Sequence, residues 1–356
     1  MEIRRSDVTV RGLTFEGERL AERYVGDGDL LGIYFRHSGG TVENCAFYGF
    51  RESTPGAEGA TAIFAYHFED NVPEATVRVV GSTFADNYRG INLIGSSTRQ
   101  SLDVSLENNT IIGPGPLTGD YLRAGIRIGE GVGGRIAGNT ISGYSYIGTT
   151  AAFPISFGIL GDNEANFPPD FGILKLLIIE GNTLHDNQMH IDLIKADGSV
   201  ISNNRCQGTA PGILPLGLAV SGTNVTIANN QFEDMPEGIR LWGNDPDYGT
   251  LLGAAVNAQI TSNRFCNVTN RINVEPLASA TETGTLACPF PSPTLAIANA
   301  VLLSWPNYAD GWTLESAPDL LGPWSPLDVA PSVQDGQYIF AVKTTSQQRF
   351  FRLRQP

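Results

Sequence analysis

The stretches GRIAGNTI (residues 134–141) and LIIEGNTL (residues 177–184) are two copies of the eight-residue unit that decides the fold. The unit occurs nine times, starting at residues 8, 40, 77, 104, 134, 177, 199, 225 and 258. In every copy the third and eighth positions are apolar, and the fifth is Gly, Asn or Ser. A repeat with a period of about 20 to 50 residues indicates a stack of similar coils.

Each position of the unit has a physical role. Alternating apolar residues predict a short strand with one face turned inward. Gly or Asn at the fifth position tolerates the left-handed backbone conformation, so the chain can turn there. The sixth position is Asn in the last six copies, and asparagines of consecutive coils can form a hydrogen-bonded ladder that satisfies buried polar groups. These asparagines are Asn109, Asn139, Asn182, Asn204, Asn230 and Asn263.

A further strand, which we call the marker strand, follows each unit and is recognised by an apolar residue that usually comes after Gly. The marker residues are Ile33, Ile63, Ile91, Ile126, Ile159, Ile191, Leu218, Ile239 and Ile272. The shortest gaps between the three apolar positions are 5, 7 and 9 residues, which give a minimal coil of 21 residues. Only the gap within the unit is constant. The bends on both sides of the marker strand therefore accept insertions, as expected when neighbouring coils hydrogen-bond along the axis.

These patterns predict an all-β fold in which a parallel β-helix of about nine coils covers residues 1–276. A linker rich in Ala, Ser, Thr, Gly and Pro covers residues 277–294, and a small β-module covers residues 295–356. A leucine-rich repeat has a similar signature. It is disfavoured because the coils vary from 22 to 43 residues, and Gly-Ile strands stand where that fold needs helices.

The strand spacing and the run of asparagines resemble the pectin-lyase-like superfamily of right-handed parallel β-helices over about residues 6–276. This resemblance implies a right-handed coil, but the superfamily includes lyases, hydrolases, epimerases, esterases and non-catalytic surface proteins. The Asn-Thr-Asp, Asp-Asp, Gly-His-Gly and Arg-Ile-Lys motifs of polygalacturonases are absent, as is the Arg-x-Pro-x-x-Arg signature of pectate lyases. The resemblance therefore transfers no catalytic residue.

The C-terminal module shows a different pattern. The segments VLLSW (301–305), WTLES (312–316), QYIFAV (337–342) and RFFRLR (349–354) predict the strands of a small β-sandwich. The stretch resembles the short β-modules that end many secreted planctomycete and verrucomicrobium proteins, which implies a bacterial, exported protein. Its tryptophans are expected to fill a small core, with a sugar-stacking platform as the alternative. They are Trp305, Trp312 and Trp324.

Charge and hydropathy limit the partners. The chain has 23 basic and 37 acidic residues and a net charge of −14, which disfavours nucleic acid and anionic membrane surfaces. No apolar run approaches the length of a membrane span. We expect a monomer whose partner is a polysaccharide, secreted or at the cell surface. Residues 1–5 lead directly into a strand pattern, so a signal sequence would have to lie outside this chain.

Candidate catalytic residues come from the outward side of the marker strands. The residues one position after each marker should face outward. The longest bends flank Ile159, so we expect a pocket between residues 142–158 and 160–178. His190 and Asp192 alternate on the next marker strand, and both are expected to face outward as acid–base groups. Lys195 is an alternative base, and Arg127 would bind a carboxylate or hydroxyl of the substrate.

Further candidates would contact the substrate or hold a metal. The candidate substrate-binding residues are Glu130, Asp162, Tyr144, Tyr146, Arg240, Trp242, Tyr66 and His67. The acidic loops 162–170 and 244–249 can supply oxygen ligands for Ca²⁺, although Asp and Asn before Pro or Gly also form ordinary turns. Two functions stay open. One is a polysaccharide lyase or glycoside hydrolase acting on a plant or algal type of glycan, and the other is a non-catalytic glycan-binding or spacer protein.

The cysteines give a test of the coil assignment. Cys45 and Cys206 belong to the second and seventh coils. Five spacings of about 4.8 Å separate them by roughly 24 Å, whereas a disulfide needs Cα atoms within about 7 Å. Peptide mapping of the non-reduced protein is therefore expected to show no Cys45–Cys206 bond, and its presence would contradict the assignment. Cys266 and Cys288 can form a disulfide or remain two buried thiols.

Overall fold

The computed structural model describes residues 1–17, 30–51, 60–67, 73–96, 100–118, 122–148, 155–162, 176–210, 215–243 and 253–288 of a first compact unit, Met1–Cys288. In the second unit, Pro289–Pro356, it describes residues 296–298, 302–306, 312–327, 332–334, 337–341 and 349–355. All regular elements in these ranges are strands. The described residues contain no helix with the length and apolar character of a membrane span.

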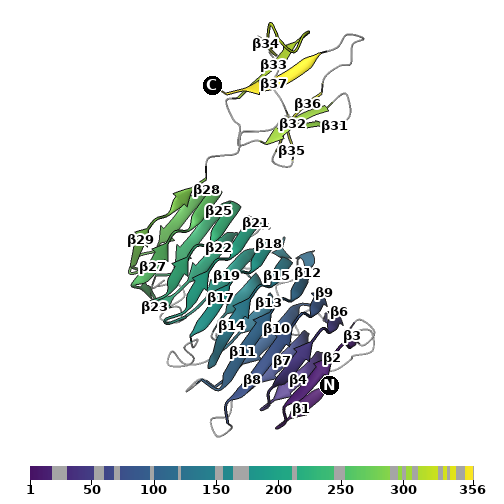
Figure 1. Cartoon of the computed structure of the whole chain (residues 1–356), viewed down its shortest axis with the longest axis vertical. Helices are drawn as coiled ribbons and strands as arrows, with labels where there is room; N and C mark the ends of the chain where they lie inside the picture. Colours follow the sequence, from purple (N-terminus) through teal and green to yellow (C-terminus); the bar gives the residue numbers. More distant parts are fainter. Residues whose placement is uncertain are drawn as a thin grey trace. The chain divides into compact units, whose positions relative to one another are not determined.

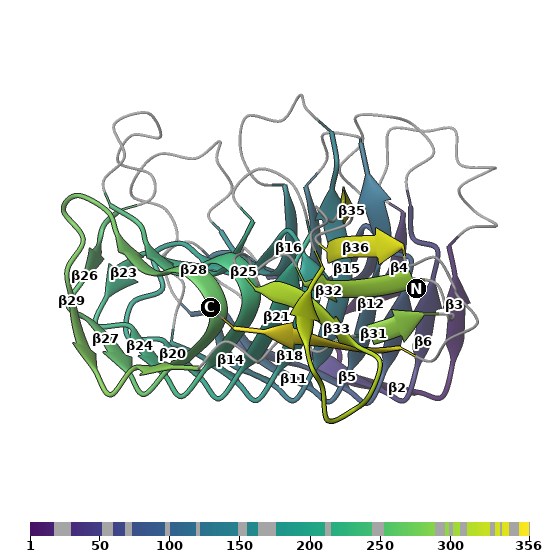
Figure 2. The ribbon, with the colours of Figure 1, turned by 90° about the horizontal axis from the view of Figure 1, so that it is seen from above.

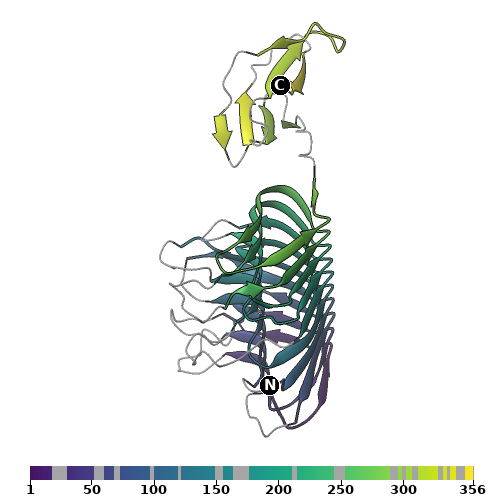
Figure 3. The same ribbon diagram turned by 90° about the vertical axis from the view of Figure 1, so that its left-hand side faces the viewer.

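The first unit is a parallel β-helix with three strands per coil (Figures 1 and 3). The first strand of each eight-residue unit contributes to a sheet of 10 parallel strands, several of which follow one another along one edge of the ribbon in Figure 2. These strands are β2 (Val8–Arg11), β5 (Gly40–Glu43), β8 (Ala75–Val80), β11 (Leu102–Glu107), β14 (Val132–Ala137), β17 (Leu177–Glu180), β20 (Val200–Ser202), β24 (Thr226–Ala228), β27 (Ala258–Thr261) and β29 (Ala280–Thr283).

The other two strands of each coil belong to one 18-stranded sheet. The strands that follow the asparagine position are β3 (Thr14–Glu16), β6 (Ala46–Tyr48), β9 (Thr83–Ala85), β12 (Thr110–Leu117), β15 (Thr140–Tyr146), β18 (Thr183–Asn187), β21 (Arg205–Thr209), the first parts of β25 (Gln231–Leu241) and β28 (Arg264–Val274), and β30 (Leu286–Ala287). The marker strands are β1 (Glu2–Arg4), β4 (Leu31–Arg36), β7 (Thr61–Tyr66), β10 (Arg89–Ile94), β13 (Arg123–Ile128), β16 (Ser156–Gly161), β19 (Met189–Leu193), β22 (Leu216–Val220) and the second parts of β25 and β28. A short pair, β23 (Gly222–Thr223) and β26 (Ala255–Val256), lies outside both sheets.

The register of the marker sheet confirms the sequence prediction. All nine marker residues, from Ile33 to Ile272, are aligned as Cα partners of one another in successive strands. Eight of them, Ile33 through Ile239, are at most 1% exposed and belong to one continuous core. The core is filled by like side chains stacked along the axis, such as Phe15, Phe47 and Phe84, whose rings are nearly parallel with centroids 4.8 and 4.9 Å apart.

The fifth position of the unit adopts the left-handed backbone conformation in all nine copies, with φ between +51° and +66°. This includes Ser262, a residue without the particular tolerance of Gly or Asn for this region. The bend is constant because it must direct the side chain of the next residue, the sixth of the unit, into the coil.

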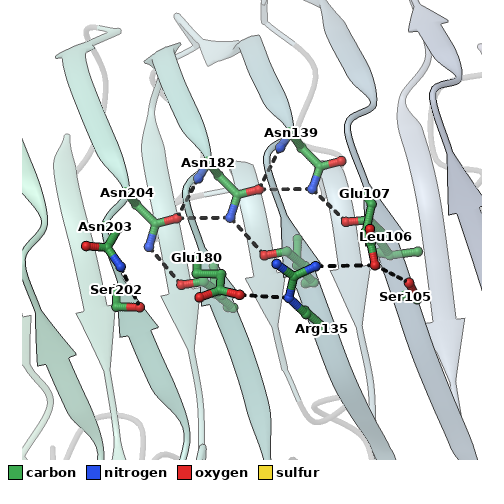
Figure 4. Close-up of polar contacts among 12 residues, drawn as sticks. Ser105, Leu106, Glu107, Arg135, Asn139, Glu180, Asn182, Ser202, Asn203 and Asn204 are labelled. Carbon is green, nitrogen blue, oxygen red and sulfur yellow. Dashed lines mark hydrogen bonds and ion pairs between the residues drawn. The ribbon is translucent and has the colours of Figure 1, made fainter.

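The asparagine ladder is present and continuous. The side-chain Oδ1 atom of each Asn from Asn139 onward accepts hydrogen bonds from the backbone N–H and the Nδ2 of the Asn one coil earlier. Each Nδ2 also donates to the backbone carbonyl of the third position of the preceding unit, as from Asn182 to Ile136. Figure 4 shows three rungs, Asn139, Asn182 and Asn204. The ladder thus satisfies backbone groups that the bend leaves without partners.

The β-helix continues beyond the predicted boundary at residue 276. Strand β29 pairs in parallel with β27, and β30 pairs with β28, so part of the predicted linker forms a tenth coil. The apolar pattern did not reveal this coil because Glu282 occupies the third position, opposite Ile260. Gly284 keeps the left-handed bend, with φ +65°. A disulfide joins Cys266 to Cys288 at this end, while Cys45 and Cys206 are free and buried, as the coil assignment predicts.

The second unit contains two small antiparallel sheets. One consists of β31 (Ala296–Ala298), β32 (Leu302–Pro306), β36 (Gln337–Ala341) and β35 (Ser332–Gln334), and the other of β34 (Ser325–Pro326), β33 (Thr313–Ala317) and β37 (Phe350–Arg354). Trp305 is buried with Leu303 and Leu314, and Trp312 packs against them. Trp324 lies under the guanidinium of Arg352, 4.4 Å from the ring centre.

Loss of one ladder rung should destabilise the first unit. Asn182→Leu removes the acceptor of two Asn139 donors and the donor to the Ile136 carbonyl. Because an unsatisfied buried polar group costs about 1–3 kcal/mol, we expect the free energy of unfolding to fall by at least that amount. Asn270→Leu, at an exposed position, is the control and should leave the melting temperature nearly unchanged. Equal melting temperatures for the two variants would contradict a stabilising ladder.

Candidate functional site

The outward row that the sequence predicts on the marker sheet is present. The residues directly after the markers are Cα partners from strand to strand, and because the markers point into the core, these residues point away from it. They are Tyr34, Phe64, Asn92, Arg127, Leu160, Asp192, Ala219, Arg240 and Asn273. The charged members Arg127, Asp192 and Arg240 lie on alternate strands, about 9.6 Å apart along the axis, and the apolar Leu160 and Ala219 lie between them.

A second outward row lies beside the first, two positions before each marker. Its members in five successive coils are Ala124, Phe157, Met189, Leu216 and Glu237. The apolar members pack with Leu160 and Ala219 into a buried cluster distinct from the core of the coils. The two rows are three residues apart along the chain, so strict alternation is broken between them. The extra position is glycine in most coils, as at Gly125, Gly158 and Gly217.

His190 occupies that extra position, opposite Gly158, and does not face outward. A side chain added at Gly158 would meet Leu184 and Asn187 inside the bend. The His190 ring is fully buried, and its Nδ1 lies 3.2 Å from the Asn187 side-chain amide. Burial lowers the pKa of His190 to about 3. The expectation of an outward acid–base histidine is therefore wrong, because the break in alternation turns this residue inward.

Arg127 and Asp162 form a buried, bidentate ion pair. The Nε and Nη2 atoms of Arg127 donate to the two carboxylate oxygens of Asp162, each at 3.0 Å. The two residues are 7% and 9% exposed. Asp162 directly follows β16, one coil after Arg127, so the candidate anchor for a substrate carboxylate already has a carboxylate partner within the protein.

Asp192 is the sixth of the nine residues in the row and is 7% exposed. Its Oδ1 accepts a hydrogen bond of 3.0 Å from Nε1 of Trp242. The pKa of Asp192 is raised to about 7, chiefly by burial and also by the charge of Asp162, while the Trp242 hydrogen bond and Arg240 act in the opposite direction. A carboxyl group with a pKa near neutrality can both donate and accept a proton under ordinary conditions.

Arg127, Asp162 and Asp192, together with Arg240, Trp242 and their carboxylate partners, form a group that we call the Asp192 cluster. Arg240 and Trp242 extend this cluster towards the last coils. The Arg240 guanidinium lies 5.2 Å from the centre of the Trp242 ring. It donates to both carboxylate oxygens of Glu237, at 2.6 and 3.0 Å, and lies 3.5 Å from Glu275. The hydrogen bonds to Glu237 raise the pKa of Arg240. The sequence did not identify Glu237 as a site residue. The sequence signal for Glu237 is its spacing of three residues from Arg240. Because the glycine between the two rows breaks the alternation, residues with this spacing both face outward.

Other candidates lie elsewhere. Tyr144 and Tyr146, expected to line the pocket, are fully buried, and Tyr144 belongs to the core of the coils. Burial raises the pKa of Tyr144 well above its usual value. Tyr144 is buried because β15 turns it into the core of the coils, and Tyr146, the last residue of the same strand, is buried as well.

The bends hold two more candidates. Glu130 is buried in the bend after β13, and Lys195 is half-buried in the bend after β19. Tyr66 and His67 lie at β7, four strands of the marker sheet before β19, and so do not join the Asp192 cluster. Of the candidate Ca²⁺ loops 162–170 and 244–249, only Asp162 lies within the described residues, and it is paired with Arg127. Within the described residues, no group of three or more His, Cys, Asp or Glu side chains is arranged to hold a metal.

Comparison with known proteins identifies the fold. A family model described as a right handed beta helix region matches residues 31–275. A search of curated proteins finds no match. Among solved structures, a double mutant of the periplasmic alginate epimerase AlgG is 14% identical, with a TM-score of 0.47, over 79% of this chain and 69% of the other.

Two further structures are similar at lower scores. DFA-IIIase from Arthrobacter chlorophenolicus is 13% identical with a TM-score of 0.38, over 73% of this chain and 64% of the other. A mannuronic acid specific polysaccharide family 6 lyase from the human gut microbiota is 10% identical with a TM-score of 0.33, over 78% and 82%. At these identities the likeness concerns the fold alone.

Burial of Asp192 makes stability depend on pH. An unfolded Asp loses its proton near pH 3.9, whereas folded Asp192 keeps it up to about pH 7. The folded state therefore loses stability as the pH rises from about 4 to 7. We expect Asp192→Asn to match the wild type at pH 4 and to be more stable by up to a few kcal/mol at pH 8. Removal of an exposed carboxylate would instead leave the melting temperature nearly unchanged.

The measurement is thermal unfolding of both proteins from pH 4 to 8. Asp234→Asn is the matched control, because Asp234 is exposed on β25, has a positive φ of +55° that Asn tolerates, and accepts a hydrogen bond from the Asn267 side-chain amide, which does not titrate. This variant should follow the wild-type pH dependence. A constant difference between Asp192→Asn and the wild type across this range would show that Asp192 is ionised in the folded protein.

Proposed function

This chain belongs to the right-handed β-helix family, and on that premise we propose that it is a polysaccharide-cleaving enzyme whose substrate lies along the outer face of the marker sheet. The observation that carries the proposal is Asp192, a carboxyl group with its pKa raised to about 7, placed against an indole ring in an outward row that also carries Arg127 and Arg240. Charged groups on alternate strands suit a linear polymer, because polar contacts recur at a regular spacing of about 9.6 Å along its length.

Two carboxyl groups in different environments support acid–base chemistry. Asp192 retains a proton near neutral pH, while Asp162 offers a carboxylate held by Arg127. Divergent environments of paired carboxyl groups are typical of glycoside hydrolases. In the proposed reaction Asp192 protonates the leaving glycosidic oxygen, and Asp162 takes a proton from the water that attacks the anomeric carbon. One glycosidic bond breaks, and the products are a new reducing end and a free hydroxyl group.

Hydrolysis of a neutral glycan fits the charges better than elimination from a uronic acid polymer. Elimination needs a cation to neutralise the substrate carboxylate next to the proton that is removed. Both arginines of the cluster are engaged by protein carboxylates, Arg127 by Asp162 and Arg240 by Glu237 and Glu275. A uronate would meet more negative than positive groups here. Lys195, in the bend after β19, is the alternative base if elimination occurs.

The proposal predicts a pH profile and a loss of activity. If Asp192 is the proton donor, turnover should decline as the pH rises through about 7, because the carboxyl group then loses its proton. Asp192→Asn should reduce kcat at least about 100-fold, whereas Asp234→Asn should not. Purified protein would be tested on a panel of neutral and uronic acid polysaccharides, with a reducing-end assay and absorbance at 235 nm in parallel.

The outcomes separate the alternatives. New reducing ends without absorbance at 235 nm support hydrolysis, and unsaturated products would show elimination instead. Unchanged turnover in Asp192→Asn would place the active site elsewhere in the chain. Retention of a polysaccharide without any product would favour a non-catalytic glycan-binding protein.

A further inference from the structure

A groove of about 790 Å³ lies near the N-terminal end of the first unit, away from the Asp192 cluster. It is formed where the bends after the marker strands β1, β4 and β7 meet the strands β2, β5 and β8. Its volume falls within the range of small-molecule sites, about 300–1,000 Å³. Its titratable lining residues are Arg5, Asp7, His37, His67, Glu74 and Arg78.

The groove is built by a bend that successive coils repeat. Arg5, His37 and His67 directly follow Arg4, Arg36 and Tyr66, which are Cα partners in neighbouring marker strands. Arg5 and His37 share the same left-handed conformation, with φ +48°. The centres of the His37 and His67 imidazole rings are 5.9 Å apart, and the rings lie at 74° to each other. Stacking of coils therefore brings three side chains from distant parts of the sequence into one groove.

The chemistry of the lining favours an uncharged, hydroxyl-rich ligand. The guanidinium groups of Arg5 and Arg78 are balanced by the carboxylates of Asp7 and Glu74, so the groove has no excess of either sign. Hydroxyl groups line it as well, from Ser6, Thr9, Thr41 and Thr76. Carboxylates accept and guanidinium groups donate hydrogen bonds, and a sugar hydroxyl can do both.

An aromatic platform adjoins the groove on the outer face of the marker sheet. The Tyr34 and Phe64 rings are stacked at 5.2 Å, and Tyr66 is 6.0 Å from Phe64. His37 of the groove is 6.2 Å from Tyr66, so platform and groove are continuous. The three platform residues are partly exposed. Aromatic faces of this kind offer apolar contact to the C–H face of a sugar ring, while its hydroxyl groups reach polar partners.

We propose that the groove and the aromatic platform form a second binding site, which holds neutral saccharide units of a polymer. Tyr66 lies on β7, four marker strands before Asp192 on β19, so the two sites are roughly 19 Å apart along the axis. The choice of ligand class rests on the proposed function, while the site itself rests on the groove and the platform. Two sites on one polymer raise its affinity over that of a short oligosaccharide, which reaches only one of them.

The experiment measures binding of the full chain to soluble neutral polysaccharides by affinity electrophoresis. Hydroxyethylcellulose, xyloglucan, galactomannan and laminarin are the probes, with polygalacturonate as the anionic comparison. The parent protein carries Asp192→Asn, so that turnover does not remove the probe. Arg78→Ala and Tyr66→Ala alter side chains that are at least partly exposed, and their folding is checked by melting temperature. Arg205→Ala on β21, which removes an exposed ion pair with Glu233 on β25, is the control.

We expect Arg78→Ala and Tyr66→Ala each to weaken binding of a retained neutral polysaccharide at least 5-fold, while Arg205→Ala does not. If Arg78→Ala in the groove and Tyr66→Ala in the platform both bind as the parent does, the second site is overturned. Failure of the parent to bind any neutral probe would overturn it as well. Retention of polygalacturonate alone would overturn the neutral ligand class.

The two proposals fail separately. If groove variants weaken binding but the wild-type chain hydrolyses nothing, the second site stands and the proposed enzymatic function falls. If the wild type cleaves a glycan in an Asp192-dependent manner but the groove variants bind normally, the second site falls and the enzyme stands.

Discussion

The structure depends on one repeated hydrogen-bonding constraint at the bend between the first two strands of each coil. The fifth residue of the unit turns left-handed, which leaves backbone groups of the bend inside the molecule. The asparagine side chain one coil later accepts from the backbone N–H of the residue after the bend, as Asn204 does from Asn182. Its own amide donates to a backbone carbonyl of the preceding coil, as Asn204 does to Ile179. A coil without this residue needs a substitute, and Ser82 supplies one where the ladder begins, since its Oγ accepts from the Cys45 N–H and its own N–H donates to Asn109. Each coil is thereby fixed to its neighbours at one corner.

That fixed corner explains why the rest of the coil can vary. With one bend held constant, the marker strands stay in register although the chain between them changes in length. The outward residues of these strands then form rows along the axis. Arg127 and Asp162 are 35 residues apart, and Trp242 and Asp192 are 50 apart, yet both pairs are in direct contact. Insertions therefore alter the loops without moving the functional groups of the sheet.

The charge arrangement follows from burial rather than from the number of charged residues. The chain has a net charge of −14, but the Asp192 cluster contains two buried or half-buried arginines, each engaged by carboxylates. Asp192 lacks an ion-pair partner of comparable geometry among the described residues, and its hydrogen bond comes from a neutral indole. Desolvation therefore dominates, which raises the pKa of this carboxyl group, whereas the N-terminal groove combines groups of both signs with greater exposure.

The sequence by itself determined the β-helix, the left-handed fifth position, the ladder and the register of the marker residues, because each is a local pattern repeated at every coil. It also placed Arg127, Asp192 and Arg240 in one outward row. Only the tertiary structure decided which of these side chains meet. Alternation fails at the glycine before the marker, so His190 turns inward and Glu237 outward, and neither follows from a period of two. Partners such as Asp162 and Trp242 come from other coils, and their approach depends on how loops of different lengths return the chain to the sheet. The tenth coil was hidden for a related reason, since at the open end of the stack Glu282 can replace the apolar residue that every interior coil requires.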